Sequence, residues 1–284
     1  MNTPRKKNAG PPIFADIKLA RRLEAGEVFT MHAYVASTHK NCPDNKEIVL
    51  KDVAGGVMLY AIAGSPANHA VGMGMRKPVT KRDIARAERF YFSRNAPVEI
   101  SVCPITELNF AQMLGARGYR ITEYVNVLYR NMQDWKPVLK QSKGLKVSKN
   151  RPEDAEIATN LIADGFTDHK LPPAVRATMV EFQRLKGALC YMAYVGGKPV
   201  ASSSGLICPK LKLAMLYGSS TLPKFRNRRA QSVMIEARLK EARAAGCELA
   251  TISTFPGTTS QHNAERIGFR VAYTKLTFVK DPPK

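Results

Sequence analysis

Between residues 211 and 278 the spacing of apolar positions changes repeatedly, which predicts strands that alternate with helices. Continuous apolar runs that end in small polar residues are typical of buried strands, whereas apolar residues at every third or fourth position are typical of helices. A glycine follows each of the two helical stretches, as it commonly does at helix ends. The predicted elements are a strand over 211–222, a helix from about 230 to 245, a strand over 247–254, a short helix over 260–267 and a strand over 269–278.

The same criteria divide the rest of the chain. Thr80, with Asp83 three residues later, predicts the N-terminal cap of a helix. In the first half we expect a helix over 17–25, a strand over 28–36, a loop over 37–46, two strands within 48–63, a short strand over 70–75, a helix over 78–92, a strand over 98–102, a helix over 106–116 and a strand over 121–129. In the second half we expect a strand from 145, helices over 155–166 and 171–185, and a hairpin built from 188–195 and 199–207.

A short motif occurs twice in the chain. Gly-Tyr-Arg at 118–120 and Gly-Phe-Arg at 268–270 lie 150 residues apart, each after a predicted strand, turn and helix and before a predicted strand. Such a repeat at about half the chain length predicts two copies of one fold. The predicted organisation is a basic leader over 1–12, a first domain over 13–131, a linker over 132–144 and a second domain over 145–284.

Four cations lie within the loop Lys224 to Arg229, between the strand over 211–222 and the helix that follows it. The N-terminus of a helix presents unpaired backbone N–H groups and the positive end of the helix dipole, so it attracts anions. The loop therefore predicts a phosphate site, with a pyrophosphate as the natural ligand. The alternative interpretation is a surface loop whose arginines are only solvated.

The order of residues in this region resembles the GNAT acyltransferase superfamily. The resemblance implies an α/β fold with a mixed sheet, that is, two GNAT-like domains in tandem, each with a central mixed β-sheet flanked by helices. It is firm over about 145–280 and weaker over 13–131. It rests on Leu222-Pro223, the loop at Arg226, the long helix, the segment 244–247, the segment 254–258, the segment 260–266 and the Gly-Phe-Arg motif.

The resemblance further implies acetyl-CoA as co-substrate. In the superfamily the loop follows the pattern Gln/Arg-x-x-Gly-x-Gly/Ala and wraps the pyrophosphate with its amides. Arg226 fills the first position, but the two small-residue positions hold Arg229 and Gln231. Glycine allows close approach and unusual dihedral angles, so the departure concerns the cofactor contact itself. The expected cofactor-binding residues are Ser220, Thr221, Leu222, Arg226, Arg228, Arg229, Ala230, Gln231, Ser232 and Asn263. The first copy has no such loop between residues 75 and 85, so we expect no cofactor site there.

The reaction implied is direct attack of an amine on acetyl-CoA in a ternary complex, which requires no enzyme nucleophile. Many members place a tyrosine where this chain has Ala264, so the usual general acid is missing. The candidates for its role are Tyr217, Asn263 and Tyr273. Each also has a structural interpretation, as a core aromatic or a surface amide. His262 we interpret as a surface residue.

The charge of the chain bears on which functions and which classes of partner it favours. The 284 residues carry a net charge of +21, with 21 Lys/Arg against 12 Asp/Glu in residues 1–142 and 23 against 11 in residues 143–284. No RNA-binding aromatic motif, zinc finger or basic heptad accompanies this charge, so a nucleic-acid partner is disfavoured. We favour an acyltransferase acting on an amine-bearing acceptor. A degenerate CoA-binding or regulatory module, and a basic interaction protein that binds nucleic acid or an acidic partner, stay open as alternatives.

The cysteine pattern argues against a metal site, and the hydropathy pattern argues against a membrane-spanning helix. The five cysteines are scattered and form no Cys/His cluster, so we expect no metal. No apolar stretch approaches the length of a membrane-spanning helix, and the first residues lack the apolar segment of a secretory signal. We therefore expect a cytoplasmic protein with no membrane partner.

Overall fold

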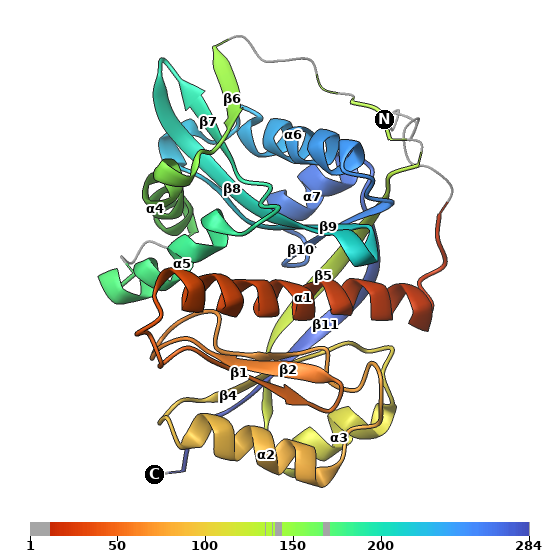
Figure 1. Ribbon diagram of the computed structural model, residues 1–284. Coiled ribbons are helices and arrows are strands. Elements are labelled where there is room, and N and C mark those ends of the chain that lie inside the picture. Colours follow the sequence, from red (N-terminus) through yellow and green to blue (C-terminus); the bar gives the residue numbers. More distant parts are fainter. Residues whose placement is uncertain (1–11, 134, 138, 140–143, 167–170, 284) are drawn as a thin grey trace. The chain divides into compact units, whose positions relative to one another are not determined.

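The computed structural model describes residues 12–133, 135–137, 139, 144–166 and 171–283 (Figure 1). Nearly all of the leader expected over 1–12, and part of the linker expected over 132–144, lie outside the described residues. No described helix is long and apolar enough to cross a membrane. The described residues contain no group of three or more His, Cys, Asp or Glu side chains placed to hold a metal ion.

The chain forms two compact units that do not follow the chain order. The N-terminal unit consists of residues 15–126 and 272–284, and the C-terminal unit consists of residues 1–14 and 127–271. Two strands pass from one unit into the other, β5 (Arg120–Asn131) and β11 (Arg270–Lys280). Residues 272–280 of β11 therefore belong to the N-terminal unit. The predicted domain ranges, 13–131 and 145–284, assign this strand to the second domain, and they stay a prediction.

The N-terminal unit contains one mixed sheet with strand order β1-β2-β3-β4-β11-β5. β3 and β4 are parallel, and β11 is antiparallel to β4. Helices α2 and α3 cover one face through an apolar cluster that includes Ile84, Tyr91, Ile100 and Phe110. The remaining elements are α1 (Ile17–Asn41), β1 (Val49–Val53), β2 (Gly56–Tyr60), β3 (Ala70–Val71), α2 (Lys81–Phe92), β4 (Val98–Val102) and α3 (Leu108–Ala116).

The first helix corrects the prediction for residues 17–46. The expected helix over 17–25, strand over 28–36 and start of the loop at 37 form the single helix α1. Gly26 does not end the helix, because it is buried and its carbonyl accepts a hydrogen bond from Thr30 Oγ1 at 2.9 Å. The buried positions continue at helical spacing through Tyr34 and Thr38. Tertiary burial thus outweighs the strand preference of the run over 28–36.

Other local predictions for this unit are confirmed. The side chain of Thr80 accepts from the backbone N–H of Asp83, and the Asp83 carboxylate accepts from the backbone N–H of Thr80. β1 and β2, the two strands predicted within 48–63, pair around a turn at Ala54 and Gly55, both with positive φ. The short motif at 118–120 leads from α3 into β5.

A buried group of charges holds the end of β11 within the N-terminal unit. Lys275 Nζ lies 2.9 Å from a carboxylate oxygen of Glu24 and 2.7 Å from one of Glu27. Tyr273 donates its hydroxyl to the same Glu24 oxygen at 2.7 Å. Because Lys275 and Glu24 are both almost fully buried, each needs the other to offset the loss of hydration.

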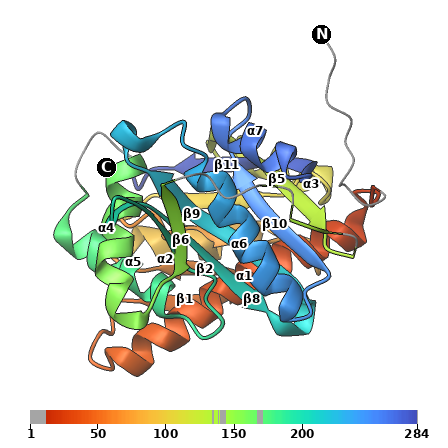
Figure 2. The ribbon, with the colours of Figure 1, turned by 90° about the horizontal axis from the view of Figure 1, so that it is seen from above.

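The C-terminal unit contains a sheet with strand order β6-β7-β8-β9-β10-β5. β9 and β10 are parallel, whereas β6 to β9 are antiparallel. Met234 and Ile235 of α6 pack on one face, and α4 and α5 cover the other (Figures 1 and 2). The elements are β6 (Leu145–Lys149), α4 (Ala155–Phe166), α5 (Pro173–Arg184), β7 (Tyr191–Val195), β8 (Lys198–Cys208), β9 (Leu213–Thr221), α6 (Ala230–Ala244), β10 (Leu249–Thr254) and α7 (Thr259–Arg266). The helices and strands predicted here are confirmed.

We predict that Glu99 makes the stability of the N-terminal unit depend on pH. Burial, followed by the nearby Glu123 carboxylate, raises the pKa of Glu99 from 4.5 to about 7. Between these values the folded chain keeps a proton that the unfolded chain loses, so stability falls as the pH rises from about 4.5 to about 7. Glu99→Gln should be about 1–2 kcal/mol more stable than the parent at pH 8, after allowance for partial exposure.

Urea unfolding at pH 5 and pH 8 measures this effect. The control is Glu47→Gln, which changes the same charge at an exposed position of the same unit. If Glu99→Gln and Glu47→Gln shift the unfolding free energy equally at both pH values, Glu99 is not the source of the pH dependence.

Candidate active site

The parallel strands β9 and β10 separate near their C-terminal ends. Their register runs from Leu213 and Leu249 to Leu216 and Ile252, although β9 continues to Thr221. β9 carries one extra residue relative to β8 in this region, and Gly218 lies within the bulge with φ of +50°. A bulge bends its strand and increases its twist. The edge of β9 that faces β10 is therefore left without a strand partner beyond Leu216.

Three hydroxyl groups near this separation have no hydrogen-bond partner among the described residues. They belong to Tyr217 and Ser219 of β9 and to Thr254 at the end of β10, and their oxygens are buried. Burying a hydroxyl without a partner costs about 1–3 kcal/mol, so a ligand that supplied partners would recover that loss. Ser220 differs, because its hydroxyl donates to the carbonyl of Leu161 in α4 at 2.8 Å.

The loop between β9 and α6 keeps the backbone shape that glycine would give. Arg229 is the N-cap of α6 and has φ of +64°, in the left-handed region, and Asn227 also has φ of +64°. A residue with a Cβ costs about 1–2 kcal/mol in that region. No side chain in the described part of the chain caps the helix, so its first backbone N–H groups are left to other acceptors. The position where the pattern requires glycine thus retains the glycine conformation despite its arginine side chain.

The loop arginines differ in their contacts. Arg226 folds back on the loop, where Nε donates to the carbonyl of Thr221 at 3.3 Å and Nη2 donates to the carbonyl of Gly165 at 3.1 Å. Arg228 lies over the ring of Phe225, with its guanidinium carbon 5.7 Å from the ring centre. Arg229 is exposed. Arg226 therefore fixes the loop to the end of α4, whereas the exposed side chains of Arg228 and Arg229 make no such bond to a described residue.

The second departure from the pattern, at Gln231, has a visible structural use. Its side-chain Nε2 donates to Ser260 Oγ at 2.9 Å, and its Oε1 accepts from Asn263 Nδ2 at 2.8 Å. These bonds join the first turn of α6 to α7. Two residues expected to contact the cofactor, Gln231 and Asn263, therefore bond to each other.

The remaining expected cofactor residues lie around the same loop. The backbone N–H of Leu222 donates to the carbonyl of Val200 at 3.0 Å, which holds the end of β9 against β8. Ala230 is buried in the core, and Ser232 is half-buried in the first turn of α6. Thr221, as the last residue of β9, offers the carbonyl that Arg226 uses.

The three candidate catalytic residues fall in different places. The ring of Tyr217 contacts the ring of Phe182 of α5 edge to face, with 6.0 Å between the ring centres. Burial raises the pKa of the Tyr217 hydroxyl well above 10, so the hydroxyl stays protonated. Tyr273 belongs to the N-terminal unit, where its hydroxyl is bonded to Glu24. Asn263 is bonded to Gln231. Ala264, at the usual tyrosine position, is fully buried.

Sequence reasoning missed two residues that shape this region. A Cβ at Gly165 would lie 2.3 Å from Ser220 Oγ, so glycine is needed where the end of α4 approaches β9. Arg238 of α6 is fully buried, and its Nη1 donates to the carbonyl of Ser204 at 2.6 Å. Burial lowers the pKa of Arg238 to about 10. Its spacing of four from Met234 could have shown that it lies on the core face of the helix.

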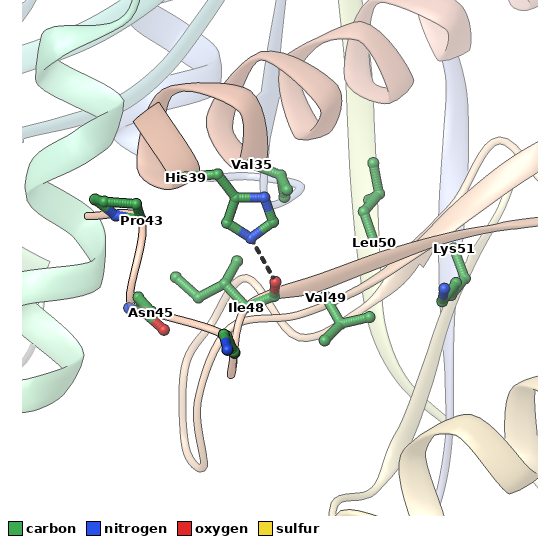
Figure 3. A pocket seen from close by; sticks show the side chains of 9 residues that line it. Val35, His39, Pro43, Asn45, Ile48, Val49, Leu50 and Lys51 are labelled. Atoms are coloured by element: carbon green, nitrogen blue, oxygen red, sulfur yellow. Dashed lines mark hydrogen bonds between the residues drawn. The ribbon is translucent and has the colours of Figure 1, made fainter. Parts of the chain in front are cut away.

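A separate hollow of about 480 Å³ lies in the N-terminal unit, at the end of α1 and along β1 (Figure 3). Its lining includes apolar side chains such as Val35 and Ile48 and the polar side chain of His39, whose Nε2 lies 3.0 Å from the carbonyl oxygen of Ile48. None of the expected site residues lines it. The hollow is therefore distinct from the candidate active site.

Comparison with solved structures identifies the fold of the chain, whereas comparisons by sequence find no match. No family model and no curated protein sequence matches the chain. Among solved structures, the chain is similar to a GCN5-related N-acetyltransferase from Kribbella flavida, with TM-score 0.62 and 14% identity over 89% of this chain and 96% of that one. It is also similar to a GCN5-related N-acetyltransferase from Sphaerobacter thermophilus, with TM-score 0.60 and 13% identity over 97% and 95%.

A third structure is described as a tandem GNAT protein from the clavulanic acid biosynthesis pathway, without AcCoA. It has TM-score 0.57 and 13% identity over 96% of this chain and 98% of that one. At these identities the likeness establishes the fold. The chain has the GNAT fold, as the residue pattern around Arg226 predicted, with helices flanking a mixed sheet.

We predict that Arg229→Gly stabilises the C-terminal unit by about 0.5–1 kcal/mol. Glycine relieves the left-handed strain at φ of +64°, and its greater freedom in the unfolded chain offsets part of that gain. The matched control is Arg228→Gly, which removes the same charge where φ is not positive, and it should lose about 0.5–1 kcal/mol. Chemical denaturation compares the two. Equal losses in both variants would show that the backbone at Arg229 is not strained.

Proposed function

We propose that the C-terminal unit binds acetyl-CoA and transfers its acetyl group to an amine of an acceptor molecule. The observation that carries the proposal is the separation of the parallel strands β9 and β10 beside the uncapped N-terminus of α6. The GNAT fold of the chain supports it, because structures of that fold include N-acetyltransferases.

The geometry fits an extended, polyanionic ligand. The first backbone N–H groups of α6, with the cations of Arg228 and Arg229 beside them, suit a pyrophosphate. The edge of β9 that is not paired with β10 beyond Leu216 suits an amide-containing arm that bonds to backbone as a strand would. Gln231 and Asn263 would act by fixing α7 against α6.

In the proposed reaction acetyl-CoA supplies an acetyl group activated as a thioester. The chain contributes position, because the strand edge and the helix N-terminus hold the ligand at two points. Tyr217 contributes a hydrogen-bond donor: its hydroxyl is buried, protonated and without a partner among the described residues, so it can donate a hydrogen bond to a developing negative charge. The backbone N–H groups exposed by the strand separation are further donors for that charge.

One observation favours a second candidate function, a CoA-binding module that does not catalyse. Arg226, Gln231 and Asn263 already have hydrogen-bond partners within the unit, so the site is partly satisfied without a ligand. The two functions differ in turnover. Such a module would bind acetyl-CoA and release no free CoA in the presence of any amine.

We predict that the full chain binds acetyl-CoA at one site, and that Arg229→Ala weakens the binding by about 1.5–3 kcal/mol. This is the usual contribution of a hydrogen bond to a charged group. Isothermal titration calorimetry measures both affinities, with Lys210→Ala as the control because it removes an exposed cation on the short turn between β8 and β9. No heat and no thermal stabilisation at millimolar acetyl-CoA would remove the enzyme proposal.

A second prediction concerns the Tyr217 hydroxyl. Tyr217→Phe should lower kcat about 100-fold while leaving acetyl-CoA affinity unchanged, because only the hydroxyl is removed. The readout is CoA release with a panel of amines, and the control is Tyr194→Phe, a half-buried tyrosine of β7. An unchanged kcat in Tyr217→Phe would show that the hydroxyl is a structural orphan rather than a hydrogen-bond donor in the reaction.

A further inference from the structure

A group of basic residues of the N-terminal unit lies on one helix and on the loop before it. Six exposed cations lie on α2 and the loop before it, and we name this group the α2 basic face. None of the six makes a hydrogen bond or ion pair with any described residue. They are Arg76, Lys77, Lys81, Arg82, Arg86 and Arg89.

The chain segment that carries these cations contains little compensating negative charge. Within residues 76–89 there are two acidic residues, and both are committed elsewhere. Asp83 caps the start of the helix through Thr80, with Lys77 and Arg86 nearby. Glu88 is turned inward, where it accepts from Arg117 Nε at 3.1 Å and lies 3.0 Å from Lys280 Nζ.

Helical geometry places the arginines in a row. Arg82, Arg86 and Arg89 are spaced by four and three residues, so they share the side of α2 opposite its buried residues Ile84 and Tyr91. The row extends over about 10 Å of helix axis. A duplex carries one phosphate charge per about 1.7 Å of its axis, so the row meets several phosphates at once.

We propose that the α2 basic face binds the phosphodiester backbone of a nucleic acid duplex, independently of sequence. Four of the six cations are arginines, whose planar guanidinium groups match phosphate oxygens bidentately. On α2 itself, Phe90 is buried and Phe92 packs against the core, so this helix offers no exposed aromatic ring on which unpaired bases could stack. This favours a duplex over a single strand.

The same face does not suit a membrane. Insertion into a bilayer surface requires an accessible apolar side, and the apolar side of α2 is buried against the sheet of its own unit. A lipid surface could then attract the face only through its charge. Anionic vesicles are therefore an arm of the test rather than part of the proposal.

The test compares two triple variants of the full chain. Arg82→Gln/Arg86→Gln/Arg89→Gln removes the row while keeping good helix formers. Lys146→Gln/Lys198→Gln/Lys210→Gln removes the same charge from exposed positions of the C-terminal unit. Fluorescence anisotropy with short labelled duplexes of DNA and of RNA gives the affinity as a function of salt, and circular dichroism checks that both variants fold.

For six phosphate contacts the affinity of the parent chain should fall about a thousandfold between about 50 and 200 mM salt. In the arginine variant the slope of log affinity against log salt should fall from about 5 to about 3, with binding at least about tenfold weaker. The lysine variant should keep the slope of the parent.

Three results would overturn the proposal. They are equal losses in the two variants, tighter binding of the parent to vesicles of phosphatidylserine than to either duplex, and tighter binding to polyglutamate than to either duplex. The last two results would assign the face to a lipid surface or to an acidic protein segment.

Discussion

The separation of two parallel strands determines where the other features of the C-terminal unit can act. β9 and β10 stay paired as far as Leu216 and Ile252, and the extra residue of β9 then turns that strand away from its neighbour. Because a helix that follows a strand starts at the strand's C-terminal end, the open edge of β9 and the N-terminus of α6 lie at one end of the sheet. The backbone N–H groups of both elements therefore lie at the same end of the sheet.

The two departures from the expected loop pattern show how a backbone shape can persist after its usual residues are lost. Arg229 holds the left-handed conformation that glycine adopts at no steric cost, so the chain carries strain at the start of α6. Gln231 fills space that a small residue would leave open, and its side chain bonds to Ser260 and Asn263. The loop therefore differs from the pattern in side chains while its path is kept.

Local signals in the sequence are sufficient for most of the elements but not for their partners in space. Thr80 and Asp83 cap α2 as expected, and α6 begins at Ala230 and ends before Gly246. The prediction that the first helix ends before Gly26 was wrong, because burial inside α1 compensates for the weak helix propensity of this glycine. The sheet neighbours of β11 could not be read from the chain, since strand order depends on contacts far apart in sequence.

The candidate site was only partly predictable for the same reason. The cations of the loop and its place before α6 are sequence features, and both are found. The hydrogen-bond partners of Arg226 and Gln231 could not be predicted from the sequence, because Gly165 and Ser260 lie about 60 and 29 residues away along the chain. The commitment of Tyr273 to Glu24 joins positions 249 residues apart.

The passage of β11 into the N-terminal unit has a consequence for the order in which the protein is made. A ribosome completes residues 15–126 long before it reaches residue 272, so the nascent N-terminal unit lacks the strand that lies between β4 and β5. Until Lys275 arrives, Glu24 and Glu27 have no counter-charge from that strand and must stay hydrated. Domains usually mature in the order of synthesis, but this unit reaches its final form only after β11, residues 270–280, has left the ribosome.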